Sequence, residues 1–198
     1  MGRVVVTEFV SLDGVIEAPG GGEGYEHAGW TFTFDRGEDG DRFKLDELMA
    51  ADAQLLGRVT YEGFAAAWPK MTGMGEFGDK MNAMPKYVVS STMAAEDAGW
   101  SNSTVIGSDL AGQVMRLKQD VAGDILIAGS ATLVRSLAEL DLVDEYRLML
   151  FPTILGSGKR LFAEGMSRMR LRLTDTKHVG PDGVLVLTYE PADRVRQA

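Results

Sequence analysis

The chain has 198 residues, a hydrophobic fraction of 45% and a formal net charge of −9, which together fit one globular domain with a substantial core. The acidic balance argues against a nucleic-acid partner, and no apolar run approaches the roughly 18–20 residues that span a membrane, which argues against a membrane partner. The absence of cysteine excludes disulfides and thiolate metal sites, and the two histidines lie too far apart in the sequence to suggest a histidine metal cluster, so we expect a cytoplasmic protein without a bound metal.

The first half of the chain alternates strand patterns with helix patterns. Strands are predicted at 3–10, 53–57, 87–91 and 103–106, and helices at 41–51, 59–67 and 109–121. Two long segments rich in glycine, 11–38 and 68–84, are predicted to be loops. The aromatic residues of the first loop favour a packed segment over a disordered one.

The second half of the chain ends in long strand patterns. A strand at 124–128 and a helix at 130–140 are followed by strands at 143–151, 169–178 and 184–190. A tight connection, Gly180-Pro181-Asp182-Gly183, joins the last two strands, so we expect them to pair antiparallel. The whole pattern predicts a single α/β domain over residues 1–198, with a mixed, mostly parallel sheet of eight strands flanked by four helices.

Three of the predicted strand ends carry glycine, hydroxyl groups or arginine. The segment Leu56-Gly57-Arg58-Val59-Thr60 ends a strand and opens a helix, where free backbone N–H groups and a guanidinium can hold phosphate. The other two strand ends carry Ser90, Ser91 and Thr92, and then Gly129, Ser130, Ala131 and Thr132. Three such strand ends predict one nucleotide cofactor lying across the sheet.

The element order and four motifs resemble the dihydrofolate reductase fold and, more specifically, the RibD C-terminal domain family, the reductase domain of bacterial riboflavin biosynthesis. The motifs are Ser11-Leu12-Asp13-Gly14, the segments 56–62 and 128–133, and the segment 152–162. The resemblance covers residues 3–190 and implies NADPH-dependent hydride transfer to a small heterocyclic substrate that is pterin-like or pyrimidine-like. The alternative is a non-catalytic nucleotide-binding or sensory protein on the same fold.

The resemblance implies that NADPH is held by the three strand ends. Arg58 would contact the 2′-phosphate or the pyrophosphate, Gly129 would let the pyrophosphate approach the backbone, and the helix from Ser130 would supply its positive end. The expected cofactor contacts are Ile16, Gly57, Arg58, Thr60, Ser90, Ser91, Thr92, Gly129, Ser130, Ala131, Thr132 and Leu133. Simpler roles remain open: Gly57 as a turn residue, Arg58 in a surface ion pair and Ser130 as a helix cap.

The resemblance also implies that the reacting end of the cofactor lies near the turn after the first strand. Asp13 is the candidate catalytic residue there, because a carboxylic acid can protonate the reduced product. Ile16 is expected to form an apolar wall of the nicotinamide pocket. The alternative for Asp13 is a structural role as a turn residue before Gly14.

Substrate contacts are expected from three further segments. The ring of Trp30 would cover the substrate unless it packs in the core. An acid near the start of the first helix, Asp41 or Asp39, would grip the substrate unless both residues only begin the helix. The turn that contains Gly156 and Gly158 would bind a substrate phosphate or serve as a plain connector.

The C-terminal strands bear on the oligomeric state. A long strand at the end of a sheet presents unpaired N–H and C=O groups, which a second copy of the chain can satisfy. The resemblance also implies a dimer, so we expect a homodimer. Apart from the second copy of the chain, the expected partner is the small-molecule substrate.

Overall fold

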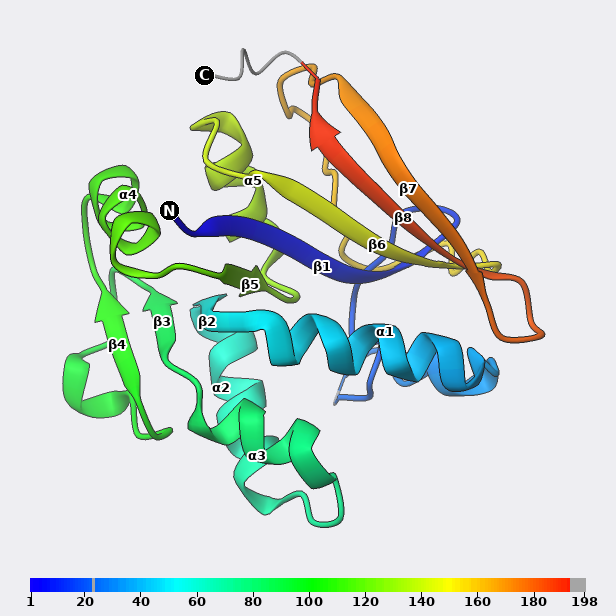
Figure 1. Cartoon of the computed structure of the whole chain (residues 1–198), viewed down its shortest axis with the longest axis horizontal. Helices are drawn as coiled ribbons and strands as arrows, with labels where there is room; N and C mark the ends of the chain where they lie inside the picture. The colour runs from blue at the N-terminus through cyan, green and yellow to red at the C-terminus, as the bar shows by residue number, and fades with distance from the viewer. Residues whose placement is uncertain (23, 193–198) are drawn as a thin grey trace.

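An eight-stranded sheet runs through the centre of the protein in the order β4-β3-β2-β5-β1-β6-β8-β7 (Figure 1). The structure is a computed structural model that describes residues 1–22 and 24–192. Its strands are β1 (Arg3–Ser11), β2 (Ala51–Gly57), β3 (Lys86–Val89), β4 (Ser103–Ile106), β5 (Asp124–Ile127), β6 (Glu145–Phe151), β7 (Leu171–Val179) and β8 (Val184–Pro191). The strands β1 to β6 run parallel, and β8 pairs antiparallel with both β6 and β7. This confirms the predicted mixed sheet with an antiparallel C-terminal pair.

Helices cover both faces of this sheet (Figure 1). They are α1 (Gly37–Ala50), α2 (Arg58–Ala67), α3 (Gly75–Ala83), α4 (Leu110–Asp120) and α5 (Ala131–Glu139), with short 3-10 helices at Trp30–Thr33, Trp68–Lys70 and Ala95–Asp97. On one face, Val5 of β1 shares a buried cluster with Leu48 of α1 and with α2 and α3. On the other face, Val4 shares a cluster with Leu133 of α5 and with α4. None of the helices in the described part of the chain has the length and apolar character of a membrane span.

The helix α3 corrects the prediction of four helices, because it lies inside the segment 68–84 that we expected to be a loop. Glycines at 73, 75 and 78 hide it in the sequence, since glycine is a poor helix former. Packing compensates: Met81 is buried against α1 and α2, and the ring of Phe77 lies 5.6 Å from that of Trp68. Tertiary contacts therefore stabilise a helix that the local sequence disfavours.

Strands β1 and β5 part before β1 ends. Their pairing stops at Val6 and Ile127, whereas β1 stays paired with β6 as far as Ser11 and Phe151. The chain then leaves β1 toward α1 on one face and leaves β5 toward α5 on the other. Sheets of this kind bind ligands outside the carboxyl ends of strands at such a topological switch point.

Buried charges on the α1 side of the sheet are paired with one another. Arg147 of β6 contacts the carboxylates of Glu145 and Glu47, and its Nη1 lies 3.5 Å from Glu47 Oε1. The other oxygen of Glu47 accepts hydrogen bonds from the Thr7 hydroxyl at 2.8 Å and from the Lys44 ammonium at 2.6 Å. Glu47 Oε1 accepts no hydrogen bond from the described residues, but the Arg147 guanidinium faces it, so each buried charge has an opposite charge beside it and the network holds α1 against the sheet.

Candidate functional site

The ends of β2 and β5 are tied together by two hydroxyl groups. The Ser130 Oγ accepts the Gly57 N–H at 2.9 Å, and the Thr60 Oγ1 accepts the Ser130 N–H at 3.0 Å. Gly129 and Ser130 both have positive φ angles, 61° and 59°. A Cβ on Gly129 would lie only 3.0 Å from the Thr60 Oγ1, so glycine is needed here for both conformation and space. The structure thus brings together Gly57, Thr60, Gly129 and Ser130.

This arrangement assigns Gly57 and Ser130 more specific roles than the sequence predicts. The Ser130 hydroxyl makes no hydrogen bond that caps its own helix, since it is turned toward Gly57. The Gly57 N–H is therefore already occupied and does not serve as a phosphate donor. The first bond within α5 runs from the Val134 N–H to the Ser130 carbonyl. The N–H groups of 131–133 consequently have no partner inside the helix and form a positive end suited to an anion.

A hollow of about 450 Å³ lies beside these ties, at the ends of β3 and β4. Its lining includes Arg58, Ser90, Ser91, Thr92, Gly107, Ser108 and Asp109. Arg58 donates to the Thr92 hydroxyl at 2.8 Å and pairs with Glu62 at 2.7 Å. The structure therefore gathers Arg58 with the predicted hydroxyl groups, and Arg58 also forms the surface ion pair that was the alternative.

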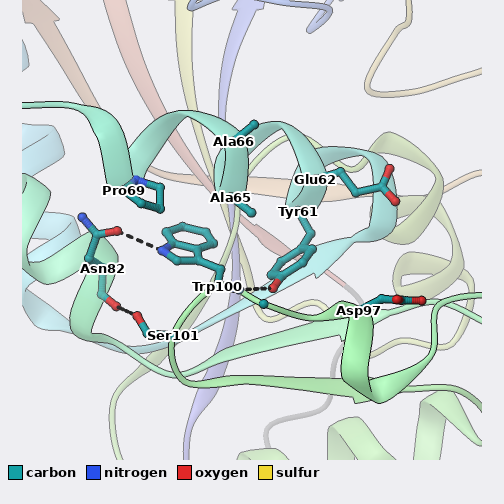
Figure 2. Close-up of a pocket in the computed structure, with 10 residues that line it drawn as sticks. Tyr61, Glu62, Ala65, Ala66, Pro69, Asn82, Asp97, Trp100 and Ser101 are labelled. Carbon is teal, nitrogen blue, oxygen red and sulfur yellow. Dashed lines mark hydrogen bonds between the residues drawn. The ribbon is translucent and has the colours of Figure 1, made fainter.

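A second hollow, of about 700 Å³, lies between α2 and the connection from β3 to β4 (Figure 2). Its polar lining groups bond to one another: Trp100 donates its indole N–H to Asn82 at 2.9 Å and its backbone N–H to the Tyr61 hydroxyl at 3.0 Å. Behind it, the buried Lys86 ammonium donates to three carbonyl groups and lies 4.1 Å from the Trp100 ring centre. Burial lowers the pKa of Lys86 to about 8. These groups already satisfy one another, so we assign them a structural role.

Asp13 is held by four groups and does not suit the acid role that the sequence suggests. Its carboxylate accepts bonds from the Ser11 hydroxyl at 2.7 Å and from the N–H groups of Leu155 at 3.1 Å and Gly156 at 2.9 Å. The Arg160 guanidinium lies 3.6 Å away. The Ser11 hydroxyl above all, and then the backbone donors, lower the pKa of Asp13 to about 2. An acid that is ionised at neutral pH has no proton to donate. The bonds that Asp13 accepts instead tie the turn after β1 to the segment after β6.

The turn at 156–159 has its donors occupied, which favours the plain connector over the predicted phosphate site. Its donors already point at carboxylates: the Gly156 N–H at Asp13, the Ser157 hydroxyl at Glu26 and the Lys159 N–H at Glu17. A phosphate would have to displace these negative groups. A Cβ on Gly158 would lie 2.8 Å from the Tyr25 hydroxyl, so this glycine is required for packing.

The other predicted substrate contacts are structural in their immediate surroundings. Trp30 is 5% exposed, donates its indole N–H to the Glu17 carbonyl at 2.9 Å, and packs edge-on against Phe151. It therefore belongs to the core. Asp41 lies in α1 and pairs with Arg36 at 2.7 Å. The predicted nicotinamide wall, Ile16, is buried in the same apolar cluster as α5.

Glu8 is a candidate that sequence analysis missed. It is 4% exposed, and its Oε1 is fully buried with no hydrogen-bond partner in the part of the chain that the structure describes. Burial raises its pKa well above the usual range, while the Gly129 N–H and Lys44 act in the opposite direction and Glu47 adds to the rise. A single acid inside the apolar run of residues 4–10 is the signal that could have identified it.

The sequence of the chain is similar to those of known proteins along most of its length. The sequence profile of the RibD C-terminal domain family matches residues 3–185. Two uncharacterized proteins of Bacillus subtilis (strain 168) are similar along almost their whole length. YyaP is 29% identical over 190 residues, 94% of each chain, and YwjB is 33% identical over 178 residues, 90% of this chain and 92% of YwjB.

Solved structures share the fold. A putative riboflavin biosynthesis protein from Shewanella superposes with a TM-score of 0.75 at 20% identity, over 96% of this chain and 98% of the other. A pyrimidine reductase-like protein from Corynebacterium diphtheriae gives 0.63 at 16% identity, over 98% and 93%. A dihydrofolate reductase from Enterococcus faecalis, complexed with NADP(H), gives 0.58 at 15% identity, over 97% and 98%.

Proposed function

Because the chain belongs to the RibD C-terminal domain family, we propose that it is an NADPH-dependent reductase acting on a small heterocyclic, pterin-like or pyrimidine-like substrate. When bound, the cofactor supplies a hydride from its nicotinamide ring. Structural neighbours that include a pyrimidine reductase-like protein and a dihydrofolate reductase with NADP(H) support this reaction class. The absence of cysteine supports a cytoplasmic location.

The observation that carries the proposal is the convergence of donors on one edge of the sheet. The first turn of α2 is hydrogen-bonded to both neighbouring segments: Thr60 bonds to the start of α5, and Arg58 bonds to Thr92 beside the hollow at β3 and β4. The N–H groups of 131–133 would hold the pyrophosphate, and Arg58 with the neighbouring hydroxyl groups would hold the adenosine end and its 2′-phosphate. The nicotinamide would then reach the separation between β1 and β5, beside Ile16.

Arg58→Ala tests the cofactor assignment. We expect NADPH to bind about tenfold more weakly and NADH to lose no more than about twofold, because only NADPH carries the 2′-phosphate. Arg135→Ala is a matched control, since Arg135 is 46% exposed like Arg58 and also pairs with a glutamate four residues on. The measurement is equilibrium titration of each dinucleotide. Equal losses for both would mean that Arg58 does not recognise the extra phosphate, and no NADPH binding by the natural protein would overturn the proposal.

Turnover separates the reductase from a non-catalytic nucleotide-binding or sensory protein. The natural protein should oxidise NADPH, measured as loss of its absorbance, with at least one acceptor from a panel of pterins, pyrimidines and quinones. Tight binding without oxidation for every acceptor would favour the sensory role.

We also propose that the protein works as a homodimer formed through β7. Among the described residues this strand is the edge of the sheet and pairs with β8 alone, and most of its residues are exposed, including Leu173. An exposed edge strand is a template for pairing with a second copy. Size-exclusion chromatography should show a dimer, and Leu173→Lys should shift it toward the monomer. A monomer at every working concentration would refute this assembly.

A further inference from the structure

We propose that Glu8 is the catalytic acid that delivers the proton accompanying hydride transfer, to an acceptor whose reduced bond ends in nitrogen or oxygen. This inference rests on the proposed function, because it names the group that completes the reduction at the same site. Glu8 takes the role that the sequence suggested for Asp13, whose carboxylate is committed to the turn after β1.

The position of Glu8 in the sheet is the first observation behind this assignment. Pairing between β1 and β5 stops at Val6 and Ile127, so Glu8 lies just beyond the last pair, at the level of Gly129. The Gly129 N–H acts on its carboxyl group. Glu8 therefore lies where the two strands part, beside the segment that would hold the pyrophosphate and near the apolar cluster that contains Ile16.

The surroundings of Glu8 are the second observation, because the residues that the structure describes supply no cation that is free to hold a carboxylate. The charged groups that act on Glu8 are Lys44 and Glu47, both on α1. The Lys44 ammonium already donates to Glu47 at 2.6 Å and to the Thr7 hydroxyl at 2.6 Å. A buried carboxyl group without a paired cation is more stable as the neutral acid. Burial therefore favours the protonated form of Glu8, whereas the donors around Asp13 favour its carboxylate.

The proton balances the reduction. When a hydride adds to the carbon of a C=N or C=O bond, the π-electron pair moves to the nitrogen or oxygen. That atom takes the proton as the O–H bond of Glu8 breaks, and a carboxylate remains. The cofactor is oxidised by two electrons and the acceptor is reduced by two. Glu8 then regains a proton from water before the next cycle.

Glu8→Gln is the first test, because glutamine keeps the size and neutrality of the acid but has no acidic proton. NADPH should bind within about twofold of the natural protein, while NADPH oxidation with the pterin, pyrimidine and quinone panel should fall about 100-fold or more. Glu145→Gln is the matched control: Glu145 is also a buried glutamate, but it pairs with Arg3 and Arg147 and should keep its activity when replaced. An unchanged turnover rate in Glu8→Gln would overturn the inference.

Difference infrared spectroscopy gives a second readout that does not depend on turnover. The natural protein at pH 7 should show the C=O stretch of a protonated carboxylic acid, and this band should shift when NADPH is added. The band should be absent from Glu8→Gln and present in Glu145→Gln. An ionised Glu8 at pH 7 would overturn the inference even if no acceptor in the panel reacts.

The two proposals fail separately. If the natural protein does not bind NADPH, the proposed function is wrong. If the natural protein binds and oxidises NADPH but Glu8→Gln does so equally well, only the role of Glu8 is wrong.

Discussion

The turn after β1 and the separation between β1 and β5 each carry a carboxyl group, and the two regions surround it in opposite ways. In the turn, Asp13 accepts hydrogen bonds from one hydroxyl and two backbone N–H groups, with a guanidinium nearby. At the separation, Glu8 has a buried oxygen without a partner in the described residues. The pKa of Asp13 is lowered to about 2, and that of Glu8 is raised.

The contrast separates an acid that holds the fold together from the acid to which we assign a chemical role. A carboxylate that accepts several donors from distant segments fastens those segments together and stays charged. A buried carboxyl group with few donors costs stability when it ionises, and such a cost is a common mark of a functional site. Position in the sequence does not distinguish the two, because both acids belong to β1 or its following turn.

The two acids should differ most clearly in what each contributes to stability. Asp13→Asn should lower the free energy of unfolding by about 2 kcal/mol at pH 7, because the amide cannot accept all the bonds that the carboxylate accepts. Glu8→Gln should not lower it, because a neutral amide suits a site that favours the neutral acid. Urea unfolding followed by tryptophan fluorescence measures both variants. Equal losses would contradict the distinction between the two regions.

The pH dependence of stability should differ in sign between the two acids. The contribution of Asp13, with its pKa lowered to about 2, is complete above its unfolded pKa of about 3.9 and is lost as the pH falls toward 2. The contribution of Glu8, with its pKa raised, is complete below its unfolded pKa of about 4.3 and is lost as the pH rises through its folded value.

Urea midpoints measured across a pH series test this expectation. Asp13→Asn should flatten the decline in stability at acidic pH, and Glu8→Gln should flatten the decline on the less acidic side. If both variants kept the pH profile of the natural protein, neither acid would have the shifted pKa that the structure implies.

A smaller effect is expected at the hydroxyl ties that join the ends of β2 and β5. Thr60→Val keeps the shape of the side chain but removes the acceptor of the Ser130 N–H, so it should cost about 1 kcal/mol of unfolding free energy. NADPH binding should weaken as well, since the start of α5 loses its tie. Thr60→Ser keeps the hydroxyl and is the control. An unchanged affinity in the valine variant would mean that this tie does not shape the site.

Much of the fold follows from local patterns in the sequence. Apolar strand runs and helix periodicity predict the eight strands and their antiparallel C-terminal pair, because each strand must bury at least one face. The helix α3 is missed because its glycines carry no local helix signal, and packing against α1 and α2 forms it. Long-range packing is the part that a sequence pattern does not contain.

The candidate site also has contacts that the sequence predicts and contacts that it does not. The approach of Gly57 and Thr60 to Gly129 and Ser130 is predictable, because parallel strands end at one edge of the sheet. The role of Asp13 is not predictable from its neighbours, since two of its donors come from 155–156. Glu8 shows only a weak sequence signal, because an acid in a valine-rich strand is equally consistent with a solvent-facing position.

The two hydroxyl ties between β2 and α5 can form only after β5 has been synthesised. They join residues 70 and 73 positions apart, and both depend on β5, which inserts between β1 and β2 after those strands have been synthesised. A nascent chain that ends before β5 has a gap in the middle of its sheet and lacks the α5 part of the proposed cofactor site. NADPH should therefore stabilise the finished chain and not its folding intermediates, which makes ligand-dependent protection from proteolysis a measure of completed assembly.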